Sequence, residues 1–135
     1  MTSTPLHPAG WSQGRGYAHG MSGEGRIVVT AGQLGWDPVT LRVVSDDFAA
    51  QAAQALRNVI AVLNAGRAGP EHLVRLTWYV TSRDEYHAEL KEIGAAYRAV
   101  MGKNFPAMSV VQVVALMESQ AKVEIEATAV IPYAR

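Results

Sequence analysis

The chain has 135 residues, 49% of them hydrophobic and 18% charged, which suits one domain with a single core and argues against disorder. Lysine and arginine together number 12, as do aspartate and glutamate, so there is no basic surplus for nucleic acid or for an acidic membrane surface. Without cysteine there is no disulfide framework, thiol nucleophile or thiolate metal site. No stretch has the apolar length of a signal-peptide core or a membrane span. We therefore expect a single cytoplasmic domain over 1–135, with neither nucleic acid nor membrane as partner.

The N-terminal part of the chain predicts an arm followed by short strands. Residues 1–16 are rich in proline and glycine, which favours a loose or extended arm that ends at Tyr17. The branched run over 26–31 predicts a strand, and residues 32–38 predict a loop. The short apolar run over 41–44 predicts an edge strand.

Two helices are predicted from capping signals and helical spacing. The acidic pair at 46–47 predicts the N-cap of a first helix whose apolar residues recur at helical spacing until Gly66. A second helix is predicted over 82–102, because Ser82 is followed three residues later by a glutamate, the spacing of a capping box.

Three further strands complete the pattern. Residues 73–81 alternate between apolar and polar side chains, which predicts a strand with one buried face. The runs 107–116 and 122–131, separated by a polar tip, predict an antiparallel hairpin. The element order is then β-β-β-α-β-α-β-β, an α/β fold of the α+β kind.

A sheet with two helices has only one covered face. Alternation assigns a mixture of apolar and polar residues to the other face: Arg75, Thr77, Tyr79, Met108, Val110, Gln112, Val114, Glu124 and Glu126. Because a monomer would expose the methionine and valine side chains, this mixture favours contact with other subunits. The alternative is a solvated sheet face, which antiparallel sheets tolerate.

A series of motifs runs along nearly the whole chain. These are Gly16-Tyr17, Val29-Thr30-Ala31-Gly32-Gln33, the helix over 47–64, the strand over 76–80, Phe105-Pro106-Ala107 and Lys122-Val123-Glu124-Ile125-Glu126-Ala127. In this order and spacing they resemble the reactive intermediate deaminase (Rid, YjgF-like) family. The resemblance implies a chorismate-mutase-like fold, a mixed sheet with two helices on one face, and a homotrimer that binds a small molecule in clefts between subunits. It also implies hydrolysis of enamines and imines to 2-oxo acids and ammonia without metal or organic cofactor.

The resemblance assigns roles to individual residues of this chain. Tyr17 looks like the family's aromatic wall, Gly32 like the backbone contact beside the ligand, and Glu124 like the catalytic acid that holds or activates water. Each has a structural alternative. Tyr17 could anchor the arm, Gly32 could serve a turn, and Glu124 could be a satisfied acid in a subunit interface.

The chain departs from the family at the position where its deaminases bind the substrate carboxylate. Met108 stands where they carry an arginine, and Val110 stands where a cysteine is common, so both substrate-binding positions are apolar here. A thioether cannot neutralise a carboxylate or form a bidentate pair with it. Arg75 is a candidate replacement, with a salt bridge to Glu124 or Glu126 in the trimer as its alternative. Arg15 and His19 are a second possibility.

Two functions remain open from the sequence. The first is an enamine or imine deaminase with altered substrate specificity, motivated by Glu124. The second is a non-catalytic trimer that binds a small metabolite or a protein, motivated by Met108. The four histidines lack metal-ligand spacing, so we expect no metal site. Some members of the family carry an endoribonuclease label, which the balanced charge of this chain does not support.

Overall fold

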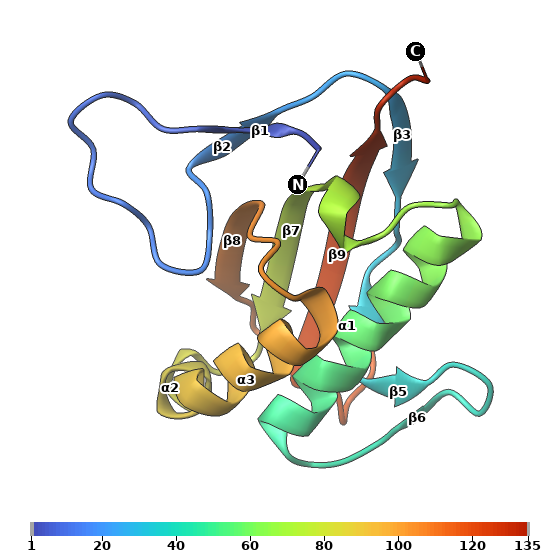
Figure 1. Ribbon diagram of the computed structural model, residues 1–135. Helices are drawn as coiled ribbons and strands as arrows, with labels where there is room; N and C mark the ends of the chain where they lie inside the picture. The colour runs from blue at the N-terminus through green and yellow to red at the C-terminus, as the bar shows by residue number, and fades with distance from the viewer. Residues whose placement is uncertain (1, 135) are drawn as a thin grey trace.

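The computed structural model describes residues 2–134 and consists of a central sheet with helices packed on one of its faces (Figure 1). The helices are α1 (Phe48–Ala65), the 3-10 turn η1 (Pro70–His72), α2 (Arg83–Ala88) and α3 (Leu90–Met101). The strands are β1 (Thr4–Leu6), β2 (Gly20–Ser22), β3 (Arg26–Val29), β4 (Gln33–Leu34), β5 (Trp36–Asp37), β6 (Arg42–Val43), β7 (Leu73–Val80), β8 (Ala107–Gln112) and β9 (Val123–Ile131). The α+β class and the mixed sheet with two main helices are confirmed. Over residues 2–134 no helix has the length and apolarity to cross a membrane.

The strand order of the central sheet is β3-β9-β7-β8, with β4 also paired to β9. Strand β9 runs antiparallel to β3, β4 and β7, whereas β8 runs parallel to β7. The predicted hairpin of the last two strands is therefore wrong, because β7 lies between them. Strand β8 already ends at Gln112, and the connection over 113–122 is longer than the tight turn that a hairpin prefers. Helices α2 and α3, which lie between β7 and β8 in the chain, instead provide the crossover that this parallel pair requires.

The pairing of β8 reverses the predicted orientation of two candidate site residues. Its parallel register sets Met108 beside Leu76 and Val110 beside Trp78. Because neighbours in register share a face, Met108 and Val110 point toward the helices and pack against the core. The prediction that they lie on the open face with the acids is wrong. Alternation along one strand fixes which residues share a face, but only its partner shows which face that is.

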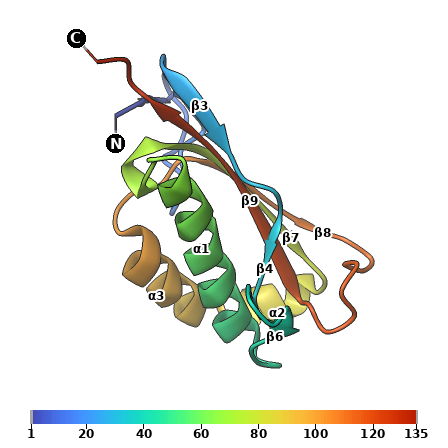
Figure 2. The same ribbon diagram turned by 90° about the vertical axis from the view of Figure 1, so that its right-hand side faces the viewer.

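The opposite face of the sheet carries no helix among the described residues, as Figure 2 shows edge-on. The register assigns to this open face Arg75, Thr77, Tyr79, Glu124, Glu126 and Thr128, together with the apolar residues Ile27, Val29 and Val111. Ile27 is 68% exposed and Val29 63% exposed. The face is mixed, as predicted, but its apolar residues are Ile27, Val29 and Val111 and not Met108 and Val110. Val114 lies beyond the end of β8 and is fully exposed.

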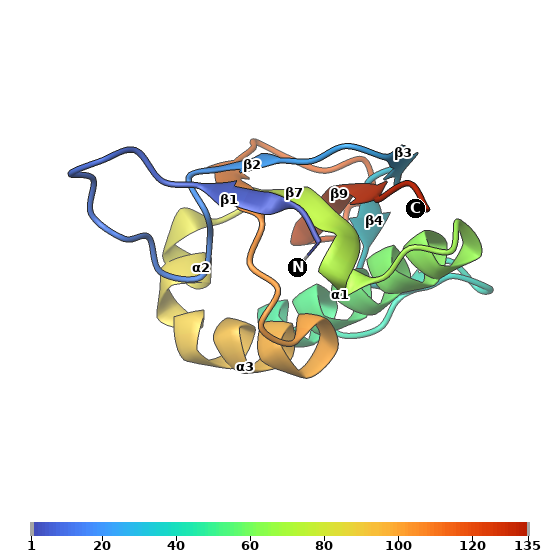
Figure 3. The ribbon, with the colours of Figure 1, turned by 45° about the horizontal axis from the view of Figure 1, so that its top comes forward.

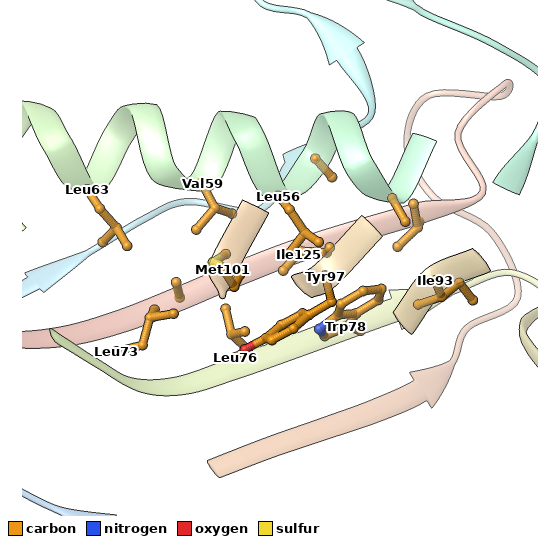
Figure 4. Packing of buried hydrophobic residues seen from close by; sticks show 14 of the residues in the cluster. Leu56, Val59, Leu63, Leu73, Leu76, Trp78, Ile93, Tyr97, Met101 and Ile125 are labelled. Atoms are coloured by element: carbon orange, nitrogen blue, oxygen red, sulfur yellow. The ribbon is translucent and has the colours of Figure 1, made fainter. Parts of the chain in front are cut away.

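Helix α1 begins and ends where the sequence predicts. The Asp47 side chain caps it by accepting a hydrogen bond from the Ala50 backbone N–H at 2.9 Å, and Gly66 follows its last residue. Its apolar stripe faces the sheet, with Leu56, Val59 and Leu63 directed at β7 and β9 (Figure 4). The core is formed by these residues together with Leu73, Leu76, Trp78, Ile93, Tyr97, Met101 and Ile125, all buried.

The second predicted helix is divided in two at Glu89, between α2 and α3. Ser82 caps α2 as predicted, since its hydroxyl accepts from the Glu85 N–H at 3.1 Å. The carboxylate of Glu85 pairs with the Lys122 ammonium at 3.1 Å. The break lets α2 turn away from the axis of α3 toward the β8 edge of the sheet (Figure 1).

The N-terminal arm is more ordered than the composition predicts. Strands β1 and β2 form an antiparallel ribbon, and the loop between them projects beyond the sheet (Figure 3). The Ala18 N–H donates to the Pro106 carbonyl at 3.0 Å, and Ala18 forms a parallel bridge with Ala107 at the start of β8. Backbone hydrogen bonds therefore hold the arm beside β8.

Candidate functional site

A cavity of about 450 Å³ lies on the helix side of the sheet, where α2 and α3, strands β7 and β8 and the N-terminal arm meet. Its lining is formed by Arg15, Gly16, Tyr17, Trp78, Tyr86, Leu90, Ile93, Gly94, Tyr97, Arg98, Phe105, Met108 and Val110. This volume falls in the range of small-molecule sites, and the mixture of apolar walls with few polar groups is typical of them. The cavity therefore contains three of the residues predicted to bind substrate, namely Tyr17, Met108 and Val110.

The floor of the cavity is formed by buried aromatic and aliphatic side chains. Trp78, Ile93 and Tyr97 are all at most 5% exposed. The Tyr97 hydroxyl donates to the Asn104 carbonyl, its ring stacks on Phe105 with centroids 5.3 Å apart, and burial raises its pKa well above the ordinary value. Burial likewise raises the pKa of Tyr86. Both phenols therefore stay neutral at physiological pH.

Tyr17 is positioned at the mouth of the cavity by the arm. Its ring meets His19 edge to face with centroids 5.6 Å apart, and the His19 Nε2 is 2.9 Å from the Ser12 carbonyl oxygen. Gly14 lies directly under the Tyr17 ring, since a Cβ there would come within 2.6 Å of ring atoms. A side chain at position 14 would displace the ring. The arm is thus built to hold Tyr17 against the start of β8.

Two guanidinium groups line the same cavity, those of Arg15 and Arg98. Both side chains are exposed, and neither forms an ion pair within residues 2–134. Arg15 was a predicted possibility, whereas the sequence did not single out Arg98. Helical spacing could have found it, because Gly94, Tyr97 and Arg98 follow Leu90 at intervals that share a helix face. His19 packs behind Tyr17 and does not line this cavity.

Gly32 and Glu124 lie together on the open face of the sheet. Strand β4 pairs with β9, and a Cβ on Gly32 would come within 2.3 Å of the Glu124 Oε2. Only glycine permits this approach of backbone to carboxylate. Glu124 is half-buried, and within the described chain its carboxylate accepts no hydrogen bond from protein groups. The Glu124 carboxylate is therefore available to accept a hydrogen bond or a proton beside the backbone of Gly32.

The neighbouring acid on the same face has a partner. The Tyr79 hydroxyl donates to the Glu126 Oε1 at 2.6 Å, and this hydrogen bond is the main reason that the pKa of Tyr79 is raised. Arg75 is exposed on the same face in a shallow hollow with Thr77 and Thr128. Within residues 2–134 it forms no ion pair with Glu124 or Glu126, and the salt bridge predicted between subunits of a trimer stays a prediction.

The predicted site residues thus form two groups on opposite faces of one sheet. Tyr17, Met108 and Val110 line the cavity on the helix side, whereas Gly32, Glu124 and Arg75 lie on the open face. In the part of the chain that the structure describes, no group of three or more histidine or acidic side chains could hold a metal ion. The chemistry available is that of a carboxylate, backbone groups, arginines and an apolar cavity.

Comparison with known proteins identifies the family. The family model described as Endoribonuclease L-PSP matches residues 12–131. The 2-iminobutanoate/2-iminopropanoate deaminase of Salmonella typhimurium is 36% identical over 109 residues, which cover 78% of this chain and 80% of the relative. The human protein of the same name is 30% identical over 105 residues, covering 78% and 73%.

Solved structures give the same result. A Rid-family protein of Yersinia pestis superposes with a TM-score of 0.84 at 30% identity, covering 97% of this chain and 100% of the other. The YjgF gene product of Escherichia coli gives 0.67 at 34% identity, covering 84% and 87%. The fold and the sequence define a small α+β subunit of the YjgF type. The chain belongs to the Rid (YjgF) family, as its motifs predicted.

Proposed function

We propose that this protein is an enamine or imine deaminase that hydrolyses reactive imines to 2-oxo acids, or other carbonyl compounds, and ammonia. Relatives about 35% identical are named 2-iminobutanoate/2-iminopropanoate deaminase. The observation that carries the proposal is the Glu124 carboxylate, half-buried against Gly32 with no protein hydrogen bond in the described chain. An available acceptor of this kind is what the hydrolysis of an imine requires.

The reaction uses the residues in the following way. Glu124 accepts a proton from a water molecule, whose oxygen attacks the imine carbon and forms a C–O bond. The proton passes to the nitrogen as the C=N π bond opens, which gives a carbinolamine. Glu124 then transfers the proton of the carbinolamine hydroxyl to the nitrogen, the C–N bond breaks, and ammonia leaves as the carbonyl forms. Positioning of water by one carboxylate supplies a rate gain of about 10²- to 10⁴-fold. The reaction needs no metal or organic cofactor, and we place it in the cytoplasm.

The site requires a second subunit, and we propose that three copies form a homotrimer with a small-molecule cleft at each interface. Glu124 and the cavity residues lie on opposite faces of the sheet, so one chain cannot bring them to the same ligand. Strand β8 is the edge strand, which leaves Met108 and Val110 next to a free sheet edge. The exposed apolar residues Ile27 and Val29 on the open face support burial against a neighbour.

The substrate specificity differs from that of the relatives, because Met108 replaces the arginine that would bind the substrate carboxylate. Each charge-assisted hydrogen bond lost at that position weakens anion binding by about 1.5 to 3 kcal/mol. We infer that small anionic imines such as 2-aminoacrylate tautomers are poor substrates. The same substitution favours a second candidate, a non-catalytic trimer that binds a small metabolite or a protein in the cleft.

Imines generated by an amino-acid oxidase test the proposal, with semicarbazide as a competing trap and 2-oxo acid as the product measured. The wild-type chain should accelerate hydrolysis, and Glu124→Gln should reduce the rate about 10²- to 10⁴-fold. Glu126→Gln is the matched control, since it removes the next acid on the same face and should keep the activity. Saturable ligand binding without any turnover would instead support the non-catalytic candidate.

A further inference from the structure

The cavity beside β8 carries an excess of positive charge at its mouth. Arg15 comes from the arm and Arg98 from the last turn of α3, and no aspartate or glutamate lines this cavity. An exposed guanidinium that has no ion-pair partner can bind a carboxylate through short charge-assisted hydrogen bonds, and the adjacent apolar wall can take the rest of the ligand. Position 108 on β8 carries no positive charge, and the arm and α3 supply it with Arg15 and Arg98.

The interior of the same cavity is aromatic. Trp78, Tyr86, Tyr97 and Phe105 contribute rings, and Tyr17 adds another at the mouth. Tyr86 also meets Phe48 edge to face with centroids 6.3 Å apart, which fixes its ring. Fixed aromatic walls favour a flat apolar ligand group, through burial of its surface and through edge-to-face or offset stacking. A methyl or ethyl side chain would leave most of the volume of about 450 Å³ unfilled.

A glycine in the middle of α3 keeps part of this volume open. Gly94 lines the cavity, and the nearest heavy atom to a Cβ built on it is the Arg98 Nη1 at 3.4 Å. Glycine weakens a helix interior relative to alanine, and packing against protein does not demand it here. The missing side chain enlarges the space between Arg98 and the aromatic rings, as a bulky ligand would require.

The floor of the cavity offers a hydrogen-bond donor without a partner. The indole Nε1 of Trp78 is buried, the side chain is 2% exposed, and within residues 2–134 no acceptor meets this N–H. Figure 4 shows the Trp78 ring beside Tyr97, in the layer between β7 and α3. Buried donors are nearly always satisfied; this N–H has almost no accessible surface, so a ligand acceptor would reach it only after the cavity wall shifts.

We propose that this cavity binds a carboxylate with an aromatic side chain, with the anion held by Arg98 and Arg15 and the ring among Trp78, Tyr86 and Tyr97. The inference rests on the proposed deaminase function only in naming the substrate: the 2-imino acid derived from an aromatic amino acid. As a statement about binding it stands on the two arginines, the aromatic walls and the open space at Gly94.

Calorimetric titration with the unreactive 2-oxo acids phenylpyruvate and pyruvate tests the ligand class without any need for turnover. Phenylpyruvate should bind at least about tenfold more tightly than pyruvate, given the burial of its ring. Arg98→Gln and Arg15→Gln should each weaken phenylpyruvate binding about tenfold, the scale of one charge-assisted hydrogen bond. Arg57→Gln, an exposed arginine of α1 outside the cavity, is the matched control and should leave binding unchanged. Thermal melting of each variant separates a loss of binding from a loss of folding.

Equal affinity for the two acids, or unchanged phenylpyruvate binding in both cavity variants, would overturn the inference. The hydrolysis assay of the proposed function separates the two claims. Tight phenylpyruvate binding without hydrolysis of any imine supports the ligand class and overturns the deaminase. Hydrolysis that favours the imine of alanine over that of phenylalanine supports the deaminase and overturns the ligand class.

Discussion

The two faces of the central sheet differ in what they can do alone. Within residues 2–134 the helix side has an aromatic cavity lined by two arginines and by no acid, whereas the open side has Glu124 beside Gly32 and only the shallow hollow at Arg75. Binding groups and the candidate proton acceptor are thus separated by the thickness of a sheet. The difference teaches that one chain can carry a formed cavity on one face of a sheet and an available carboxylate on the other without bringing the two together.

The largest effect is expected from a substitution in the proposed subunit contact that would join the two faces. Val29→Asp introduces a charge into the exposed apolar part of the open face, where Val29 is 63% exposed. Sedimentation equilibrium should show the wild-type chain near three times 14.5 kDa and the variant near one, with imine hydrolysis lost. Val39→Asp, in the loop between β5 and β6, is the control and should remain trimeric and active. A monomeric Val29→Asp protein with full activity would show that the faces act independently.

An arginine introduced into β8 should test the proposed difference in specificity between this chain and its relatives. Met108→Arg places a guanidinium at the edge of the cavity and should raise kcat/KM for small anionic imines about 10- to 100-fold, as one or two charge-assisted hydrogen bonds would. Met108→Leu conserves the volume and should leave these kinetics unchanged. If the two variants have the same kcat/KM on 2-iminopropanoate, position 108 does not set the specificity.

The phenol on the cavity floor should make stability sensitive to alkaline pH. Burial raises the pKa of Tyr97 above the ordinary value of 10.0, so above pH 10 the folded state keeps a proton that the unfolded state loses. The free energy of unfolding therefore falls as pH rises through this range. Tyr97→Phe should cost about 0.5 to 1.5 kcal/mol at neutral pH through the lost hydrogen bond to Asn104, yet lose less stability above pH 10.

Urea unfolding at neutral pH and above pH 10 measures the free energy of unfolding of each protein. Tyr133→Phe is the control because Tyr133 is exposed. Equal alkaline losses in Tyr97→Phe and in the wild-type chain would mean that another group causes the fall.

The smallest effect is expected at Gly94. Alanine should stabilise α3 by about 0.5 to 1 kcal/mol, since the Cβ meets only a flexible arginine side chain. Gly102→Ala should have the opposite sign, because Gly102 has a φ of 65°. Urea unfolding of both variants checks the stability, and titration with phenylpyruvate checks whether Gly94→Ala weakens aromatic ligands. If Gly94→Ala binds phenylpyruvate as tightly as the wild-type chain does, Gly94 does not shape the cavity for aromatic ligands.

Local patterns in the sequence were enough to predict the family, helix α1 and the strands β3, β7, β8 and β9, but not the short strands of the arm or the break between α2 and α3. Helix α1 lies between Asp47 and Gly66, as their capping chemistry predicts, and the motif that contains Glu124 falls on β9 from Val123 onward. Pairing between strands could not be predicted in the same way, because the partner of β8 depends on a crossover formed by two helices. The orientation of Met108 followed from that pairing, so its predicted face was wrong although its strand was right.

The candidate site shows the same limit. Motifs predicted Tyr17, Gly32 and Glu124 one at a time, and nothing local indicates that Tyr17 and Glu124 lie on opposite faces. Arg98 went unnoticed because its importance comes from the cavity that α3 lines together with β8 and the N-terminal arm. No local pattern in the sequence shows that these segments surround one space. Roles of the predicted site residues stay predictions until a ligand is bound.

Complementation between two inactive variants tests the shared site most directly. Glu124→Gln disables the open face, and Gly94→Leu fills the cavity from α3 while leaving the other face intact. When equal amounts are unfolded and refolded together, random mixed trimers should regain about one quarter of the wild-type rate, because a quarter of the interfaces join an intact cavity to an intact Glu124. Activity no greater than the sum of the separate variants, in trimers shown to be mixed, would contradict a site built between subunits.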